Sequence, residues 1–234
     1  MKKQIILTAF IISVLMLTGF SNSPATDKET RDVKGFTKIN FGVPGNLYIN
    51  FGPEYKVVLE GDRDILDNIL TQVSGDKLII KPDSWRLNIK NNIIVYITLP
   101  AISGLGVSGS GEAKIKEPVK SENLNLSVSG SGKLFTANVV ATVLNCGISG
   151  SGDIIIQGGG DIANADIEVS GSGNYRGEMM KIGSADISIS GSGSCVCNVT
   201  ESLKASVSGS GNVTYIGSPK VDARVSGSGR VRSK

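Results

Sequence analysis

The chain contains no histidine and few aromatic residues, and these two shortages narrow both its chemistry and its fold. Without histidine, neither a Ser-His-Asp nor a Cys-His catalytic arrangement can form, and the commonest zinc ligand is missing. Phe, Trp and Tyr make up only 5% of the 234 residues, whereas Gly accounts for 30 of them. An interior of this composition is built from small and β-branched side chains, which is typical of stacked thin sheets and excludes a helix bundle.

A strong net charge is also lacking. Lys2 and Lys3 belong to an N-terminal export segment, and without them 22 basic residues face 21 acidic ones, a net charge of about +1. Such a balance gives no field that steers polyanions, and basic residues are not interleaved with aromatic ones. The composition therefore indicates no nucleic-acid partner.

Cysteine is scarce and odd in number, with Cys146, Cys195 and Cys197 only. The Cys-Val-Cys spacing puts Cys195 and Cys197 on the same face of a strand, which is a poor geometry for a bond between them. We expect three buried small hydrophobic residues, with one disulfide or a metal site as the alternatives.

Residues 1–23 have the composition of an export signal. Met1-Lys2-Lys3 precede an apolar run from Ile5 to Leu17, and small and polar residues follow. The run is shorter than the roughly 20 residues that span a bilayer, so we expect cleavage within residues 19–25 and keep a retained anchor as the alternative. Phe20 stands where a lipobox needs its lipid-accepting Cys. We expect export to the periplasm, the outer surface or the medium, no lipid anchor, and no membrane-spanning segment after cleavage.

Seven Ser-Gly-Ser-Gly motifs dominate the second half of the chain, each directly after Val or Ile. Their offsets are 21, 20, 21, 20, 18 and 18 residues, and they begin at Ser108, Ser129, Ser149, Ser170, Ser190, Ser208 and Ser226. A period of this length is typical of one supersecondary unit copied along an axis, each copy burying its apolar face against its neighbours.

Apolar residues alternate with the same parity before and after each motif. If Val207 faces inward, so do Gly209, Gly211, Val213 and Tyr215. Both glycines then face the core, as expected where a strand bends or an opposing wall leaves no room for a Cβ. The pattern predicts an all-β parallel solenoid with rungs of about 18–21 residues. An antiparallel β-meander with Gly-Ser hairpins remains the alternative.

The same parity gives two sets of candidate residues. The outward serines are a candidate surface hydroxyl ladder: Ser108, Ser110, Ser129, Ser131, Ser149, Ser151, Ser170, Ser172, Ser190, Ser192, Ser208, Ser210, Ser226 and Ser228. The structural bend glycines are Gly109, Gly111, Gly130, Gly132, Gly150, Gly152, Gly171, Gly173, Gly191, Gly193, Gly209, Gly211, Gly227 and Gly229.

Stacking of the rungs makes a further prediction, because equivalent residues should lie about 4.8 Å apart. No two like charges are adjacent at the outward position after each motif, which is occupied in order by Glu112, Lys133, Asp153, Asn174, Ser194, Asn212 and Arg230. Such a row favours the solenoid over the meander.

Residues 24–234 are interpreted as a single β-solenoid domain. Residues 24–105 are less regular and are expected to form the initial rungs and a cap, whereas residues 106–234 form the regular repeats. Residues 62–70 predict one or two helical turns. Segments 43–47 and 73–78 resemble degenerate motif copies. Turn residues predict a second break in each rung at 116–118, 158–160, 177, 183–184 and 217–219.

Four short segments precede the first motif in a fixed order. They are Gly35-Phe36 with Ile39, then Tyr55 with Val57, Leu78 with Ile80 and Pro82, and Ile97 with Leu99-Pro100 leading into the first motif. With these segments and the recurring motif, the chain resembles the bacterial head GIN domain family of proposed auto-transporter adhesins. The resemblance implies a right-handed β-helix of pectin-lyase-like shape, exported in Bacteroidetes-type bacteria. It further implies cell adhesion, with no established catalytic residues.

Three functions are compatible with these observations. The first is a non-catalytic, cofactor-free adhesion module for a glycan or cell-surface protein, whose regular hydroxyls bind through many weak hydrogen bonds. The second is a structural or self-assembling cell-envelope protein, including a homo-oligomer. The third is a β-helical polysaccharide-degrading enzyme, for which Asp153, Asp161 and Asp166 are the candidate carboxylates. We expect no enzyme.

Overall fold

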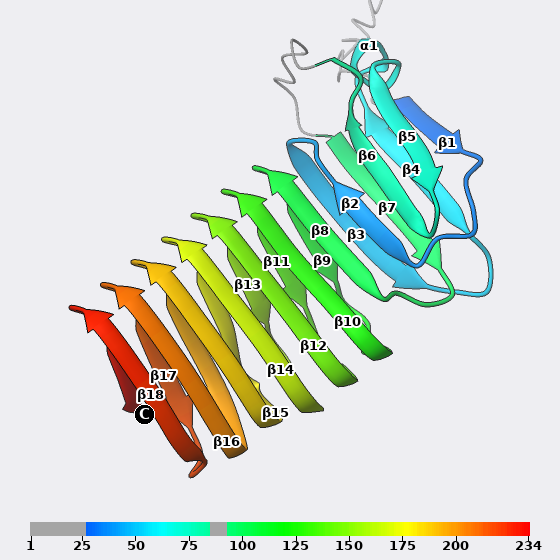
Figure 1. The fold of residues 1–234 in the computed structure, drawn as a ribbon. Helices are drawn as coiled ribbons and strands as arrows, with labels where there is room; N and C mark the ends of the chain where they lie inside the picture. Colours follow the sequence, from blue (N-terminus) through cyan, green and yellow to red (C-terminus); the bar gives the residue numbers. More distant parts are fainter. Residues whose placement is uncertain (1–26, 85–92) are drawn as a thin grey trace, which may run out of the picture.

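The computed structural model describes residues 27–84 and 93–234, and the expected signal at residues 1–23 lies outside them. The described chain is nearly all β and forms a β-solenoid of about six turns. Figure 1 shows the coils stacked along one axis, with a more irregular group of strands at the N-terminal end. The parallel β-solenoid predicted from the repeat is confirmed.

Each coil of the repeating part combines a long strand that ends in the Ser-Gly-Ser-Gly motif with a short strand that follows it. The long strands are β8 (Gly104–Gly109), β10 (Val119–Gly130), β12 (Val139–Gly150), β14 (Gly160–Gly171) and β18 (Lys220–Gly227). The short strands are β9 (Glu112–Ile115), β11 (Lys133–Thr136), β13 (Asp153–Ile156), β17 (Asn212–Ile216) and β19 (Arg230–Ser233). In β15 (Asn174–Gly191) and β16 (Ser194–Gly209) the short part runs directly into the long part.

All pairings between these strands are parallel, and the motifs stack in register. Ser129 lies between Ser108 and Ser149, and Gly130 between Gly109 and Gly150. The same register continues from β12 to β18. Because a hairpin requires antiparallel neighbours, the alternative meander with Gly-Ser hairpins is wrong.

The motif forms a sharp corner rather than an unbroken strand. Each long strand ends at the first glycine of a motif, and Gly130 has φ +109°, a conformation that favours glycine. The second glycine is buried against the preceding coil: a Cβ on Gly132 would lie 2.6 Å from the Gly111 carbonyl oxygen. The first glycine of each motif is exposed or half-exposed instead of core-facing, because the corner turns it away from the interior.

The second break occurs where expected at 116–118, 158–160 and 217–219, but not at Gly177 or Gly183. There β15 continues, and its register with β16 shifts between Gly177 and Lys181 and again between Ile182 and Ser184. Taken together, the two shifts account for the two residues by which the next rung is shorter.

The N-terminal strands begin as a coil and end as a cap. β2 (Lys38–Phe41) and β3 (Gly45–Phe51) pair in parallel with β8 and β9, while β6 (Lys77–Pro82) and β7 (Ile93–Leu99) stack beyond them. The outermost strands run antiparallel: β5 (Ile69–Ser74) on β6, β4 (Lys56–Gly61) on β7, and β1 (Asp27–Arg31) on β4.

Three local predictions in this region have different outcomes. The helical turn expected within 62–70 is α1 (Arg63–Leu66). Segment 43–47 does form a corner, between β2 and β3. Segment 73–78 forms the antiparallel connection between β5 and β6 instead, because its strands pair with each other rather than with the next coil.

The core consists of rows of equivalent side chains that stack along the axis. Val128, Ile148, Val169, Ile189 and Val207 form one such row, and each is at most 2% exposed. The apolar positions of the last coil have no coil beyond them in the structure: Val221 is 39% exposed and Val225 is 45% exposed. Each coil therefore gains its burial from both neighbours.

Candidate binding surfaces

The predicted hydroxyl ladder forms two parallel rows along the corner of the solenoid. The first serines of the motifs pair strand to strand from Ser108 to Ser226. The second serines stack beside them, because the backbone N–H of Ser131 donates to Gly109 and the corresponding bonds recur up to Ser210. Ser108 is half-exposed and the other thirteen are exposed. Within residues 27–84 and 93–234, none of the fourteen hydroxyls has a hydrogen-bond partner.

A hollow of about 540 Å³ lies at the N-terminal end of this ladder. It forms because β8 carries Gly104 and Gly106 at outward positions, between the side chains of β2 and those of β10. The polar part of its lining consists of Ser108, Ser127, Ser129, Lys38, Lys77, Asn40 and Asn125, and Ile39, Leu105 and Val107 supply an apolar part. Two members of the hydroxyl ladder therefore face a concave surface that also offers amides and cations.

A longer groove of about 770 Å³ crosses the outer face of several long strands. At this place the apolar spacing within a rung changes from two to three residues, as between Ile162 and Ala165, so that Ala163 and Asn164 are both exposed. The pairing registers also omit Thr142 and Ala163 there. The groove was not predicted, although the three-residue step between apolar positions in β12, β14 and β15 is its signal in the sequence.

The row of outward residues predicted after the motifs is confirmed. Each of its seven members pairs with the next, from Glu112 to Arg230. Asn174 Nδ2 donates to Asp153 Oδ1 at 2.8 Å, and Ser194 Oγ donates to Asn174 Oδ1 at 2.5 Å. These contacts join neighbouring coils on the short-strand side of the solenoid.

The three cysteines are free and buried. Cys146 stacks between Leu126 and Ile167, and burial raises the pKa of its thiol far above the ordinary range. The hydrogen bond with Cys197, followed by burial, also raises the pKa of Cys195. Protonated, enclosed thiols are poor nucleophiles and poor metal ligands, so they act here as small core side chains.

The candidate carboxylates Asp153, Asp161 and Asp166 do not come together. Asp153 lies on β13, between Lys133 and Asn174, whereas Asp161 and Asp166 are exposed on β14. Five residues of strand separate the latter two, which corresponds to about 16 Å and exceeds the spacing of a glycosidase pair. Among the described residues, no three His, Cys, Asp or Glu side chains are grouped as metal ligands.

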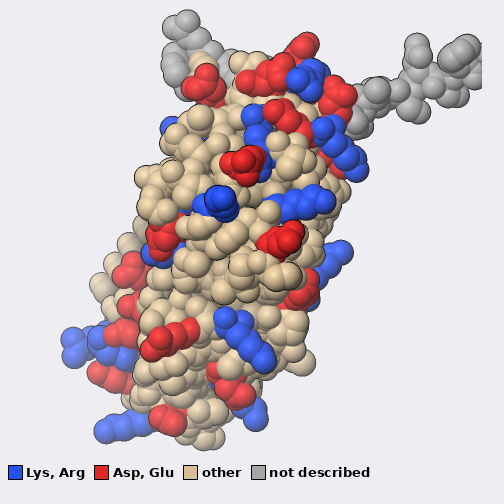
Figure 2. Space-filling model, turned by 90° about the vertical axis from the view of Figure 1, so that its right-hand side faces the viewer, with Lys and Arg blue, Asp and Glu red and all other residues tan. Residues whose placement is uncertain are grey.

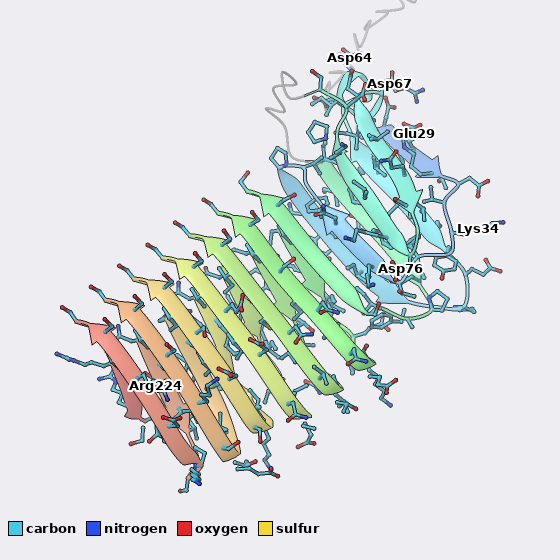
Figure 3. All side chains as sticks on the ribbon, viewed as in Figure 1. Glu29, Lys34, Asp64, Asp67, Asp76 and Arg224 are labelled. Carbon is cyan, nitrogen blue, oxygen red and sulfur yellow. The ribbon has the colours of Figure 1, made fainter. Side chains whose placement is uncertain are left out.

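Charges of both signs are distributed over the surface. Figure 2 shows acidic and basic side chains interspersed along one face. In Figure 3, Asp64, Asp67 and Glu29 lie at the capped end and Arg224 lies on the last long strand. Within the described part of the chain, we find no helix with the length and apolarity needed to cross a membrane.

The order of coils, cap and corner motifs agrees with a known protein family. A family model described as "Putative auto-transporter adhesin, head GIN domain" matches residues 35–219. The chain belongs to this family. The match covers the first coil, most of the cap and nearly all of the repeats, so the head GIN domain accounts for most of the described structure. No curated protein sequence matches the chain.

Solved structures of similar shape come from Bacteroides and Parabacteroides species. A putative adhesin from Bacteroides fragilis is 26% identical, with a TM-score of 0.84 over 91% of this chain and 98% of that one. A putative lipid binding protein from Parabacteroides distasonis is 23% identical, with a TM-score of 0.73 over 91% and 98% of the two chains. A putative adhesin from the same species is 22% identical, with a TM-score of 0.72 over 90% and 97%. The last two support the fold alone.

Proposed function

We propose that this chain is an exported, non-catalytic adhesion module that binds a cell-surface glycan through its hydroxyl ladder. The observation that carries the proposal is the alignment of fourteen serine hydroxyls on one corner, without protein partners in the described residues. The family's description as putative adhesins supports the adhesion role. The expected signal at residues 1–23 supports export, and the compartment beyond the inner membrane is part of the proposal.

The physical basis is repetition on a rigid frame. Each hydroxyl both donates and accepts a hydrogen bond, and each such bond contributes about 1 kcal/mol net. Sites spaced about 4.8 Å apart on a stacked sheet need little ordering upon binding, so that weak contacts add along an extended ligand. The hollow beside Ser108 and Ser129 supplies a place where a sugar ring is partly enclosed.

The test removes the hydroxyls without altering the corner glycines. The variant Ser129→Ala, Ser149→Ala, Ser170→Ala and Ser190→Ala should lose retention on an array of glycans that the wild-type chain binds. A matched control carries Ser184→Ala on β15 and Ser202→Ala on β16, two serines that bond each other at 2.8 Å away from the motif. The control should keep the wild-type binding.

Unchanged retention in the fourfold serine variant would exclude the ladder as the binding surface. Release of reducing sugar from acidic or neutral polysaccharides by the wild-type chain would overturn the non-catalytic role.

A self-assembling role is the second candidate, favoured by the last coil. There β18 and β19 each pair on one side only, and Val221 and Val225 are exposed. Such an edge is a template for strand addition. Light scattering that yields a mass above the monomer at micromolar concentration would support this role, and a monomer at all concentrations would exclude it.

A further inference from the structure

The short-strand side of the solenoid carries a cluster of aromatic and basic side chains, at the junction of cap and repeats. One outward row there runs through Tyr96 on β7, Tyr48 on β3, Lys114 on β9 and Phe135 on β11. Tyr48 and Tyr96 are stacked, with ring centroids 5.6 Å apart and planes inclined by 20°. Tyr96 is 37% exposed, which is high for an aromatic side chain in this protein.

Two lysines accompany the rings. Lys114 Nζ lies 5.9 Å from the Tyr48 centroid and 5.7 Å from that of Phe135, and Lys116 Nζ lies 5.8 Å from the Tyr48 centroid. Lys114 forms an ion pair with Glu112. Lys116 has no carboxylate partner in the described residues, and the neighbouring Glu117 accepts a hydrogen bond from the Phe51 N–H at 3.3 Å.

Two hollows adjoin this cluster and share Tyr48, Lys114 and Lys116. One, of about 350 Å³, is lined in addition by Tyr96 and Asn50. The other, of about 540 Å³, is lined in addition by Phe135 and Gln157. Each combines two aromatic rings and one amide group with the ammonium groups of both lysines, so each offers an apolar wall and several hydrogen-bonding atoms. The carboxylate of Glu112, which pairs with Lys114, also lines the larger hollow.

We propose that the Tyr-Lys cluster (Tyr48, Tyr96, Lys114 and Lys116) binds two successive units of an anionic sugar chain, one unit in each hollow. The C–H groups of a sugar ring carry slight positive charge and pack against aromatic rings, whose π-systems are negative. The phenol and amide groups exchange hydrogen bonds with sugar hydroxyls. The unpaired ammonium of Lys116 pairs with a carboxylate or sulfate group on the ligand.

The site is separate from the hydroxyl ladder and does not depend on it. A single-stranded nucleic acid would also combine stacking with cations, but it needs a basic track along its backbone. Here Glu112 accompanies Lys114, and the outward row beyond Phe135 continues with Ile155. Two lysines and one carboxylate fit a ligand with one charge per sugar better than a polyphosphate.

The test measures the affinity of residues 24–234 for three oligosaccharides by calorimetry. They are an oligogalacturonide with carboxylates, a chondroitin 4-sulfate fragment with sulfates, and a neutral cello-oligosaccharide. We expect at least one anionic probe to bind, more weakly as salt rises. The double variant Tyr48→Ala and Tyr96→Ala should lose affinity for it by about tenfold or more. Lys116→Met should weaken the anionic probe and leave any binding of the neutral one unchanged.

Three controls keep the result interpretable. Arg176→Ala changes a side chain of the same outward row, two strands beyond Phe135, and should bind as the wild type does. Tyr96→Phe retains the ring and should retain most of the affinity. The fourfold serine variant should also retain it, so that failure of the hydroxyl ladder and failure of this site are distinguishable. If the double tyrosine variant unfolds, Tyr96→Ala and Lys116→Met provide the same comparison at exposed positions.

The proposal is overturned by any of three results. These are no binding of either anionic probe, unchanged affinity in the tyrosine and Lys116 variants, or tighter binding of a single-stranded oligonucleotide than of any sugar.

Discussion

The capped end and the repeating part solve the problem of an open sheet edge in different ways. In the repeats, the long strands β10, β12, β14, β15 and β16 each pair in parallel with an equivalent long strand on both sides. At the N-terminal end the outer strands β1, β4 and β5 reverse direction, and large side chains such as Phe36 and Phe41 fill the core. A repeated unit extends a sheet without limit, whereas closing it requires side chains and strand directions that the repeat does not contain.

Glycine shows the same difference. In the cap, Gly75 has φ +61° and no atom within 4 Å of the place where a Cβ would lie, so that only its backbone conformation requires glycine. In the repeats, Gly132 has an ordinary φ, but a Cβ would lie 2.6 Å from the Gly111 carbonyl oxygen and 2.7 Å from a Val107 methyl group. The cap uses glycine for a turn, and the repeats use it to bring two coils together.

The largest expected effect comes from filling that contact. Gly132→Ala should lower the free energy of unfolding by about 3 kcal/mol, because a backbone carbonyl on the neighbouring coil cannot move aside. Gly75→Ala in the cap should cost only about 1 kcal/mol, the usual cost of a left-handed conformation with a Cβ. Urea unfolding of both variants measures the difference.

The matched control for this pair is Gly147→Ala. Gly147 lies in β12, has no atom within 4 Å of a Cβ position and is half-exposed. Its substitution should leave stability unchanged or raise it by about 0.5 kcal/mol. Equal losses at positions 132 and 147 would refute the role of close approach.

Hydrogen exchange should distinguish the two ends of the solenoid. Val225 in the last coil is 45% exposed, whereas its neighbour Val207 is 1% exposed. In the cap, Val57 and Leu59 on β4 are fully buried. We expect amides of β18 and β19 to exchange faster than those of β4 and β7 by about tenfold or more, because local opening costs least where burial is least. Mass spectrometry of peptic fragments provides the measurement, and uniform protection along the axis would contradict it.

A smaller effect is expected from the one large aromatic side chain in the core of the repeats. Tyr175 is fully buried, and its hydroxyl has no partner among the described residues. Burial also raises the pKa of that hydroxyl well above its ordinary value. Tyr175→Phe should therefore raise the free energy of unfolding by about 1 kcal/mol, because it removes a buried, unpaired polar group. A loss of stability in thermal unfolding would show that the hydroxyl is satisfied.

The smallest effects concern two exposed ion pairs that respond to opposite changes of pH. In the cap, the hydrogen bond from Lys38, at 2.9 Å, lowers the pKa of Asp76, so this pair stabilises the fold above the unfolded pKa and the contribution is lost in acid. In the repeats, the hydrogen bond with Asp186 raises the pKa of Lys204, so that contribution is lost as the solution becomes strongly alkaline.

The measurement compares Asp76→Asn and Lys204→Met with the wild type across the pH range. The cap variant should differ from the wild type at neutral pH and converge with it below about pH 4, the range in which a free aspartate protonates. The repeat variant should differ at neutral pH and converge only above about pH 10. Both differences should shrink in high salt, because exposed pairs are screened.

The amount of structure that could be predicted from the sequence also differs between the repeats and the rest of the chain. A fixed period determines register, so the row from Glu112 to Arg230 was predicted residue by residue and the structure confirms it. The first glycine of each motif was predicted to face the core, which is wrong, because parity counts do not detect a change in φ at a corner. The bulge in β15 was missed for a related reason: Gly177 and Gly183 are turn residues in composition but lie within a paired strand.

The Tyr-Lys cluster was not predictable in the same way. Tyr48 and Tyr96 are 48 positions apart in the sequence and meet only because β3 pairs with β7, a pairing outside the period of the repeats. The groove across the long strands could have been predicted, because the three-residue step between apolar positions recurs in β12, β14 and β15. The repeat period is enough to predict features that recur in each coil. A feature formed by strands outside the repeat can be found only from the strand pairing in the structure.

The register shifts in β15 indicate where the solenoid accommodates coils of different length. Two residues are lost between one coil and the next, yet the corner motifs on both sides remain in register, with Ser190 beside Ser208 and Gly191 beside Gly209. The side opposite the motif thus accommodates insertions and deletions, while the motifs at the corner keep their register. Duplication of one coil-sized segment would lengthen the rod by about 4.8 Å and would keep the corner motifs stacked in register. The length of such a rod therefore changes in steps of one whole coil.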